Sequence, residues 1–125
     1  MRKRRVLLVD DEVSLTRSLA LYLEECGGCE VRAENVGSRA VAAARAFDPD
    51  VIVLDIVMPD ADGGAIAAEL AADPKLGQTP VVFLTALVSQ RETGGATQRI
   101  GGRPFLAKPL DPDVVLAAVE KYARR

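Results

Sequence analysis

Apolar and polar positions follow one another in blocks along this chain, with short strand-like runs separated by longer segments of helical period. Continuous apolar runs such as 51–54 are typical of strands buried on both faces, whereas 30–34 alternates as a half-buried strand does. Strands are predicted at residues 5–9, 30–34, 51–55, 80–85 and 105–109. Helices are predicted through Leu15–Leu23 to an end at Gly27-Gly28, through 38–47, through 64–72, and from Asp111-Pro112 onward.

This alternation of strands and helices predicts an α/β fold. Parallel neighbouring strands need crossover connections, which are right-handed almost without exception. We therefore expect a doubly wound parallel sheet of five strands with helices on both faces. The pattern is interrupted at Val88–Gly102, where Gly94-Gly95 and Gly101-Gly102 break any apolar stripe. A short or irregular fourth crossover helix is expected around 89–93, with a loop or a small hairpin as alternatives.

Composition limits the class of protein further. The chain has 125 residues, 49% of them hydrophobic, and a net charge of −2. This length suits one domain, residues 1–125, and no output domain is expected. No apolar run approaches the roughly 20 residues of a membrane span, and Arg2–Arg5 leads into a strand instead of the apolar region of an export signal. We expect a cytoplasmic protein without membrane association or direct nucleic-acid binding.

The segment Cys26-Gly27-Gly28-Cys29 is a C-x-x-C motif, which raises a thiol-redox or a zinc hypothesis. A redox pair lies at a helix N-terminus, where the helix dipole stabilises the thiolate, but this pair follows a helical segment. Zinc would need further ligands, and the chain has no His and no other Cys. A glycine-rich helix end between two small residues is the favoured interpretation.

Polar side chains occur where the predicted strands end: Asp10 and Asp11 follow the first strand, Asp55 and Thr85 are the last residues of the third and fourth, and Lys108 lies near the end of the fifth. Ligands of doubly wound sheets bind outside the carboxyl ends of the strands. Carboxylates gathered at such an edge repel one another unless a cation compensates. Mg²⁺ prefers oxygen ligands and binds through a few carboxylates and phosphate oxygens. The sequence therefore predicts one Mg²⁺ ion at this edge.

Four separate blocks resemble the receiver domains of two-component signalling, in the same order and spacing. They are Leu7–Glu12 (LLVDDE), Val53–Pro59 (VLDIVMP), Leu84–Ala86 (LTA) and Phe105–Pro109 (FLAKP). The resemblance extends over essentially the whole chain. It implies a single-domain response regulator with a flavodoxin-like sheet of strand order 2-1-3-4-5, acting as a phosphoprotein in a phosphorelay.

The resemblance also implies a role for each acidic residue. Asp55 corresponds to the phospho-acceptor, whose carboxylate attacks the phosphorus of a phosphohistidine donor and forms an aspartyl phosphate. The donor would be a histidine kinase or a histidine phosphotransfer protein, and phosphorylation would switch the surface that binds a downstream protein. Asp11, Asp55 and the backbone carbonyl of Val57 would ligate Mg²⁺ directly, and Asp10 would hold it through water.

Further roles follow from the same resemblance. Lys108 and Thr85 would each contact a phosphoryl oxygen, and Thr85 would move inward as it does so. Phe105 would be a switch aromatic that turns inward with the Thr85 loop; the alternative is a strand residue packed in the core. The Lys108-Pro109 peptide bond would be cis and would direct Lys108 into the site.

Two positions depart from the pattern of rapidly self-dephosphorylating receivers, which often carry polar side chains there. Val57 and Leu87, two residues after Asp55 and Thr85, are apolar and cannot orient an attacking water. We therefore expect a comparatively long-lived phosphate in a domain that catalyses its own phosphorylation and dephosphorylation. Competing hypotheses are a docking module that is not phosphorylated and an Asp-nucleophile phosphatase; the latter would need an acidic residue where Val57 stands.

Overall fold

A parallel sheet forms the centre of the molecule, and its strands follow the predicted runs. The computed structural model describes residues 2–86, 98–100 and 102–124. The parallel strands are β1 (Arg5–Val9), β2 (Glu30–Glu34), β3 (Val51–Asp55), β6 (Val81–Thr85) and β8 (Arg103–Ala107). Their order is β2-β1-β3-β6-β8, and each neighbouring pair among them is parallel. The predicted five-stranded sheet of order 2-1-3-4-5 is confirmed.

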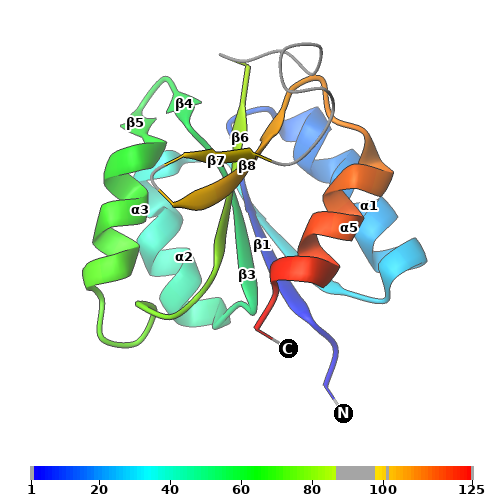
Figure 1. Cartoon of the computed structure of the whole chain (residues 1–125), viewed down its shortest axis with the longest axis horizontal. Helices are drawn as coiled ribbons and strands as arrows, with labels where there is room; N and C mark the ends of the chain where they lie inside the picture. The colour runs from blue at the N-terminus through cyan, green and yellow to red at the C-terminus, as the bar shows by residue number, and fades with distance from the viewer. Residues whose placement is uncertain (1, 87–97, 101, 125) are drawn as a thin grey trace.

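Helices cover both faces of this sheet (Figure 1). They are α2 (Ala40–Phe47) and α3 (Gly63–Ala72) on one face, and α1 (Val13–Gly27) and α5 (Pro112–Tyr122) on the other. Successive side chains of a strand point to opposite faces, so β3 serves both layers. Ile52 and Leu54 belong to the layer under α2 and α3, whereas Val51 and Val53 belong to the layer under α1 and α5.

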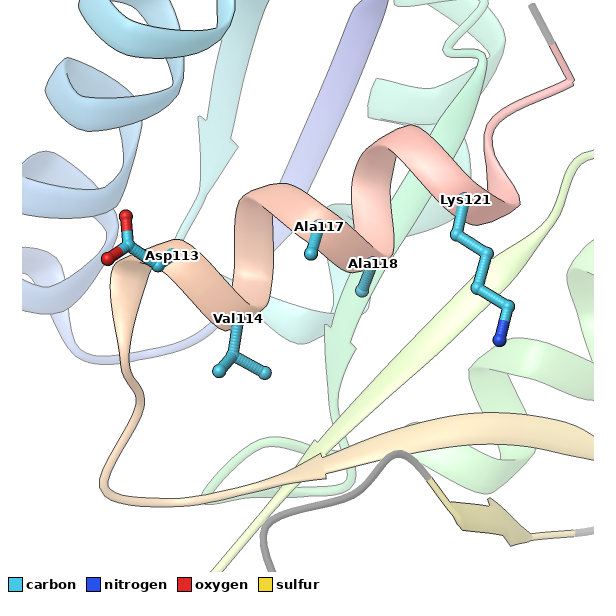
Figure 2. A pocket seen from close by; sticks show the side chains of 5 residues that line it. All are labelled: Asp113, Val114, Ala117, Ala118 and Lys121. Atoms are coloured by element: carbon cyan, nitrogen blue, oxygen red, sulfur yellow. The ribbon is translucent and has the colours of Figure 1, made fainter.

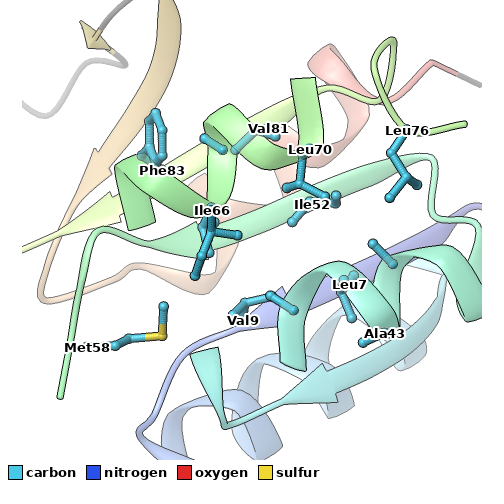
Figure 3. Packing of buried hydrophobic residues seen from close by; sticks show 14 of the residues in the cluster. Leu7, Val9, Ala43, Ile52, Met58, Ile66, Leu70, Leu76, Val81 and Phe83 are labelled. Atoms are coloured by element: carbon cyan, nitrogen blue, oxygen red, sulfur yellow. The ribbon is translucent and has the colours of Figure 1, made fainter. Parts of the chain in front are cut away.

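The layer under α2 and α3 is shown in Figure 3. Ile66 and Leu70 of α3 lie over Ile52 of β3, and Phe83 of β6 extends the same apolar cluster. All of these side chains are buried. Because β3 is buried along its whole length between two apolar layers, its final residue is held in a fixed place at the edge of the sheet.

Some elements were not predicted. A two-stranded antiparallel hairpin, β4 (Val57–Met58) and β5 (Ala61–Asp62), follows β3 in a segment where no strand was predicted. β7 (Gln98–Ile100) pairs antiparallel with β8 and adds an edge strand, so this part of the interrupted segment forms a small hairpin. The irregular helix expected around 89–93 lies outside the described residues. The helix predicted from residue 38 begins with a 3-10 turn, η1 (Gly37–Arg39).

Side-chain caps begin the two helices that follow strands β5 and β8. Asp62 accepts a hydrogen bond from Gly64 N at the start of α3, and Asp111 accepts one from Asp113 N at the start of α5. The predicted start of the last helix at Asp111-Pro112 agrees with this cap. Among the helices of the described residues, none has the length and apolar character needed to cross a bilayer.

Candidate functional site

The carboxyl edge of the sheet brings the predicted acidic residues together. β1 and β3 are parallel neighbours, so Asp10, which follows β1, and Asp55, the last residue of β3, leave the sheet at the same edge. One carboxylate oxygen from each of Asp10, Asp11 and Asp55 lies within 4.8 Å of the others. Asp10 and Asp55 are buried, whereas Asp11 is exposed. The acid cluster, as we call these three residues, is therefore open to solvent on the side of Asp11.

Lys108 provides a positive charge beside the acid cluster. Its Nζ lies 2.8 Å from Asp10 Oδ2 and 3.4 Å from Asp55 Oδ2. The residue follows β8, and its backbone N–H donates to the carbonyl oxygen of Thr85 at 2.8 Å. The Lys108-Pro109 peptide bond is cis. The ends of β6 and β8 are thus joined at the point where Lys108 reaches the acidic residues.

The remaining predicted site residues lie around this cluster. Thr85 ends β6 and is fully buried. Val57 is 59% exposed, and its backbone N–H donates to Asp55 Oδ1 at 3.4 Å. Phe105 lies in β8 and packs in the layer under α2 and α3, the position of a core residue. Leu87 lies outside the described residues. The switch roles of Thr85 and Phe105 stay predictions.

Burial and neighbouring charge control the protonation of the site. Burial raises the pKa of Asp55, and the Asp10 carboxylate raises it further, while Lys108 and the Val57 N–H act in the opposite direction. Burial alone would lower the pKa of Lys108, but Asp10 and Asp55 outweigh it and leave that pKa above its ordinary value. The site therefore keeps the ammonium charged, and a second cation would favour the ionised form of Asp55.

Several residues that the sequence analysis did not single out shape the site. Gly63 N donates to the Ile56 carbonyl at 2.8 Å, and a Cβ at Gly63 would lie only 2.4 Å from the Asp55 carbonyl oxygen. Only glycine permits α3 to begin this close to the end of β3. In the sequence, the signal for this close approach was the Asp62-Gly63 pair, which follows the strand that ends at Asp55. Asn35 and Asp60, which contact the loops of the site, had no such signal.

The donor set fits a hard divalent cation. It consists of the three clustered carboxylates, and oxygen ligands of this kind are what Mg²⁺ prefers. Asp10 Oδ2 is buried, and within the described part of the chain no donor is aligned to hydrogen-bond it, although Lys108 lies beside it as an ion pair. A buried carboxylate oxygen without an aligned donor can still accept a hydrogen bond from a metal-bound water, which is the role expected of Asp10.

A free thiol pair and a hollow along α5 are distinct from the acid cluster. Cys26 is exposed and Cys29 is buried, both as free thiols, and burial raises the pKa of the Cys29 thiol. A raised pKa opposes the thiolate that redox chemistry needs. A shallow hollow runs along α5 (Figure 2). Its lining residues are Asp113, Val114, Ala117, Ala118 and Lys121, none of which belongs to the acid cluster.

The chain belongs to the response regulator receiver domains, whose family profile matches residues 6–120. It is therefore a phospho-acceptor domain of two-component signalling, a class that typically uses Mg²⁺ and receives its phosphoryl group from a histidine kinase.

Relatives of this family match over most of the chain. Protein PilH of Pseudomonas aeruginosa is 35% identical over 116 residues, which cover 92% of this chain and 93% of PilH. The transcriptional regulator RpaA of Synechocystis is 32% identical over 97% of this chain, and the chain spans about half the length of this and several other curated relatives.

Among solved structures, chemotaxis response regulator CheY4 of Vibrio cholerae is similar with a TM-score of 0.80 and 27% identity, covering 97% of this chain and 99% of CheY4. The BeF3-activated receiver domain of Klebsiella pneumoniae RstA has a TM-score of 0.76 and 26% identity, covering 98% of this chain and the whole of that domain.

Proposed function

We propose that this receiver domain accepts a phosphoryl group on Asp55 from a phosphohistidine donor, with Mg²⁺ bound at the acid cluster. The observation that carries the proposal is the convergence of Asp10, Asp11 and Asp55 within 4.8 Å, with Lys108 Nζ 3.4 Å from Asp55. A carboxylate that takes no part in chemistry would not need two neighbouring acidic residues and an ammonium group. A nucleophilic carboxylate that gains a dianionic group needs both the cation site and the ammonium.

The transfer forms a bond between an Asp55 carboxylate oxygen and phosphorus. It breaks the phosphorus–nitrogen bond of the donor, whose electron pair returns to the imidazole nitrogen. Asp11, Asp55 and the Val57 carbonyl would hold Mg²⁺ directly, and Asp10 would hold it through water. The bound ion would supply neutralisation of the charge that develops on the phosphoryl oxygens.

Lys108 and Thr85 complete the proposed chemistry. Lys108 Nζ already contacts Asp55 Oδ2, so a short movement brings it to a phosphoryl oxygen, to which it donates a charge-assisted hydrogen bond. The Thr85 hydroxyl donates to another phosphoryl oxygen. The backbone N–H of Lys108 donates to the Thr85 carbonyl oxygen. Because of this hydrogen bond, a displacement of Thr85 would also displace Lys108, and the reverse. Such movement would alter the surface presented to a downstream protein.

The test is phosphorylation with acetyl phosphate or a phosphorylated histidine kinase, with and without Mg²⁺, followed by intact mass. We expect wild type to gain one phosphoryl group only with Mg²⁺ and Asp55→Asn to gain none. Asp48→Asn is the matched control, because Asp48 lies beyond the amino end of β3 in a left-handed conformation (φ 53°) that Asn tolerates well. That variant should label like wild type.

Other results would change the conclusion. No gain of mass with any donor would favour a docking module that works without phosphorylation. Equal labelling of Asp55→Asn would place the acceptor elsewhere. The expectations of a cytoplasmic protein and of a receiver without an output domain stay predictions.

A further inference from the structure

The connection between β2 and α2 supplies no group to the acid cluster, yet it contacts both loops that carry the proposed metal ligands. We propose that this connection, residues 35–38, holds those loops at the spacing that Mg²⁺ requires, with Asn35 and Asp60 as positioning residues. The inference rests on the proposed function, because it concerns the same site. It assigns a role to residues that lie outside the four motif blocks.

The first contact is made by Asn35. Its Nδ2 donates to the Asp10 carbonyl oxygen at 2.8 Å and to Thr16 Oγ1 at 2.9 Å. The buried Thr16 hydroxyl donates in turn to the Val13 carbonyl at 3.1 Å. On the amide side, Asp10 N donates to the Glu34 carbonyl at 3.2 Å. The backbone that carries the first two acidic ligands is therefore held at both its N–H and its carbonyl by residues 34 and 35.

The second contact is made by Asp60, in the turn of the β4–β5 hairpin. Its carboxylate accepts from Ser38 N at 3.0 Å and from Gly37 N at 3.2 Å. These hydrogen bonds, the one from Ser38 foremost, hold the pKa of Asp60 below its ordinary value, so the carboxylate stays ionised and keeps both donors. Val57, whose carbonyl is a proposed ligand, lies on the first strand of this hairpin.

Close packing supports the same contact. A Cβ at Gly37 would lie 2.7 Å from Ala61 Cβ and 3.1 Å from Met58 Cε. The connection and the hairpin thus approach too closely for any side chain at Gly37. Asn35 and Gly37 are only two residues apart in the sequence. The Asp10 loop and the Val57 hairpin are therefore hydrogen-bonded to the same short segment.

This arrangement matters because Mg²⁺ tolerates little variation in ligand position. It demands near-octahedral geometry at about 2.0–2.1 Å, and it gives up its waters reluctantly. Residues that orient metal ligands typically affect metal affinity by about 10- to 100-fold. A connection that fixes the distance between two ligand-bearing loops acts on affinity in this way.

The experiment measures Mg²⁺ alone binding to the unphosphorylated chain by titration calorimetry. We compare wild type, Asn35→Ala and Asp60→Ala with Gln78→Ala as control, an exposed amide just before the amino end of β6. The first two variants should weaken Mg²⁺ binding about tenfold, the lower end for supporting residues, and the control should not change it. Hydrogen exchange of the Gly37 and Ser38 amides should become faster in Asp60→Ala.

Phosphorylation by acetyl phosphate adds a second readout. The Mg²⁺ concentration for half-maximal rate should rise in both variants, while the rate at saturating Mg²⁺ stays at the wild-type value. Asp60→Asn keeps one acceptor oxygen without the charge, so its affinity should fall between wild type and Asp60→Ala. An Asp60→Asn loss as large as that of Asp60→Ala would show that charge acts, and would overturn the positioning role of Asp60.

The two proposals fail differently. Lower thermal stability of Asn35→Ala and Asp60→Ala with unchanged Mg²⁺ affinity would overturn the positioning role and leave the proposed function intact. Since Asp60 is exposed, its variant should fold even if Asn35→Ala does not. No Mg²⁺ binding by wild type would overturn both proposals.

Discussion

At the residue scale, Val57 is an apolar residue two positions after the proposed acceptor, where rapidly self-dephosphorylating receivers often carry a polar side chain. It is 59% exposed beside Asp55 and cannot hydrogen-bond a water. We predict that Val57→Asn shortens the lifetime of the aspartyl phosphate about fivefold, the rate equivalent of one hydrogen bond worth about 1 kcal/mol. The decay of the phosphorylated mass after removal of the donor measures this lifetime.

Val57→Ala is the matched control, because it changes size without adding a hydrogen-bonding group, and its phosphate should persist as in wild type. Adding a polar residue at Leu87 to Val57→Asn should shorten the lifetime further. A longer lifetime in the doubly polar variant would contradict the hypothesis.

The same scale shows which site residues a sequence can reveal. Asp10, Asp55 and Lys108 could be predicted because each ends an apolar run, and parallel strands bring such ends to one edge. Asn35 and Asp60 could not, because their roles depend on hydrogen bonds to loops 25 and 22 residues away in sequence. A polar residue in a loop gives no local sign of such a partner.

At the element scale, the β3, β6 and β1 strands were predictable because they are buried on both faces and therefore continuously apolar. The β4–β5 hairpin was not, since strands of two residues carry no periodicity. β7 lies where glycines disrupt both helical and strand patterns, and its place at the edge is decided by pairing with β8. Local pattern thus predicts the buried centre of the fold better than its margins.

The turn after α3 provides a prediction about pH. Asp73 Oδ1 accepts from Lys75 N and Leu76 N at 2.8 and 3.2 Å, and Oδ2 contacts the Arg45 guanidinium at 2.6 Å. These contacts, that of Arg45 foremost, lower the pKa of Asp73. A lowered pKa means that the stabilisation is complete above the unfolded value of about 3.9 and is lost as pH falls through the folded value.

Asp73→Asn should therefore be less stable than wild type at pH 7, and the difference should shrink as pH falls below about 4. Urea unfolding followed by circular dichroism over a series of pH values measures this. In an Arg45→Gln background the effect of Asp73→Asn should be smaller, because the first of its partners is already removed. A difference that grows on acidification would contradict the assigned sign.

At the scale of the whole molecule, the proposed phosphorylation site and a set of contacts that joins the two terminal segments lie at opposite edges of the sheet. The acid cluster lies at the carboxyl edge, while both terminal segments meet at the amino edge (Figure 1). Asp50, just before β3, joins them there. Its fully buried carboxylate accepts from Arg5 N at 2.8 Å and from the Arg2 guanidinium at 3.0 Å. Its carbonyl accepts from Arg124 N at 3.1 Å.

Asp50→Ala should lower the free energy of unfolding by about 2 kcal/mol, because the Arg5 N–H loses its acceptor in a partly buried place. The Arg2 side chain is 31% exposed and regains water, so its lost ion pair adds little. Asp50→Asn retains one acceptor oxygen and should lose less.

Since this contact lies a full strand length from Asp55, Mg²⁺ affinity and phosphorylation of the folded protein should stay at wild-type values in both variants. A parallel loss of Mg²⁺ affinity, measured by calorimetry well below the unfolding temperature, would show that the two edges are coupled through β3 and would contradict their separation.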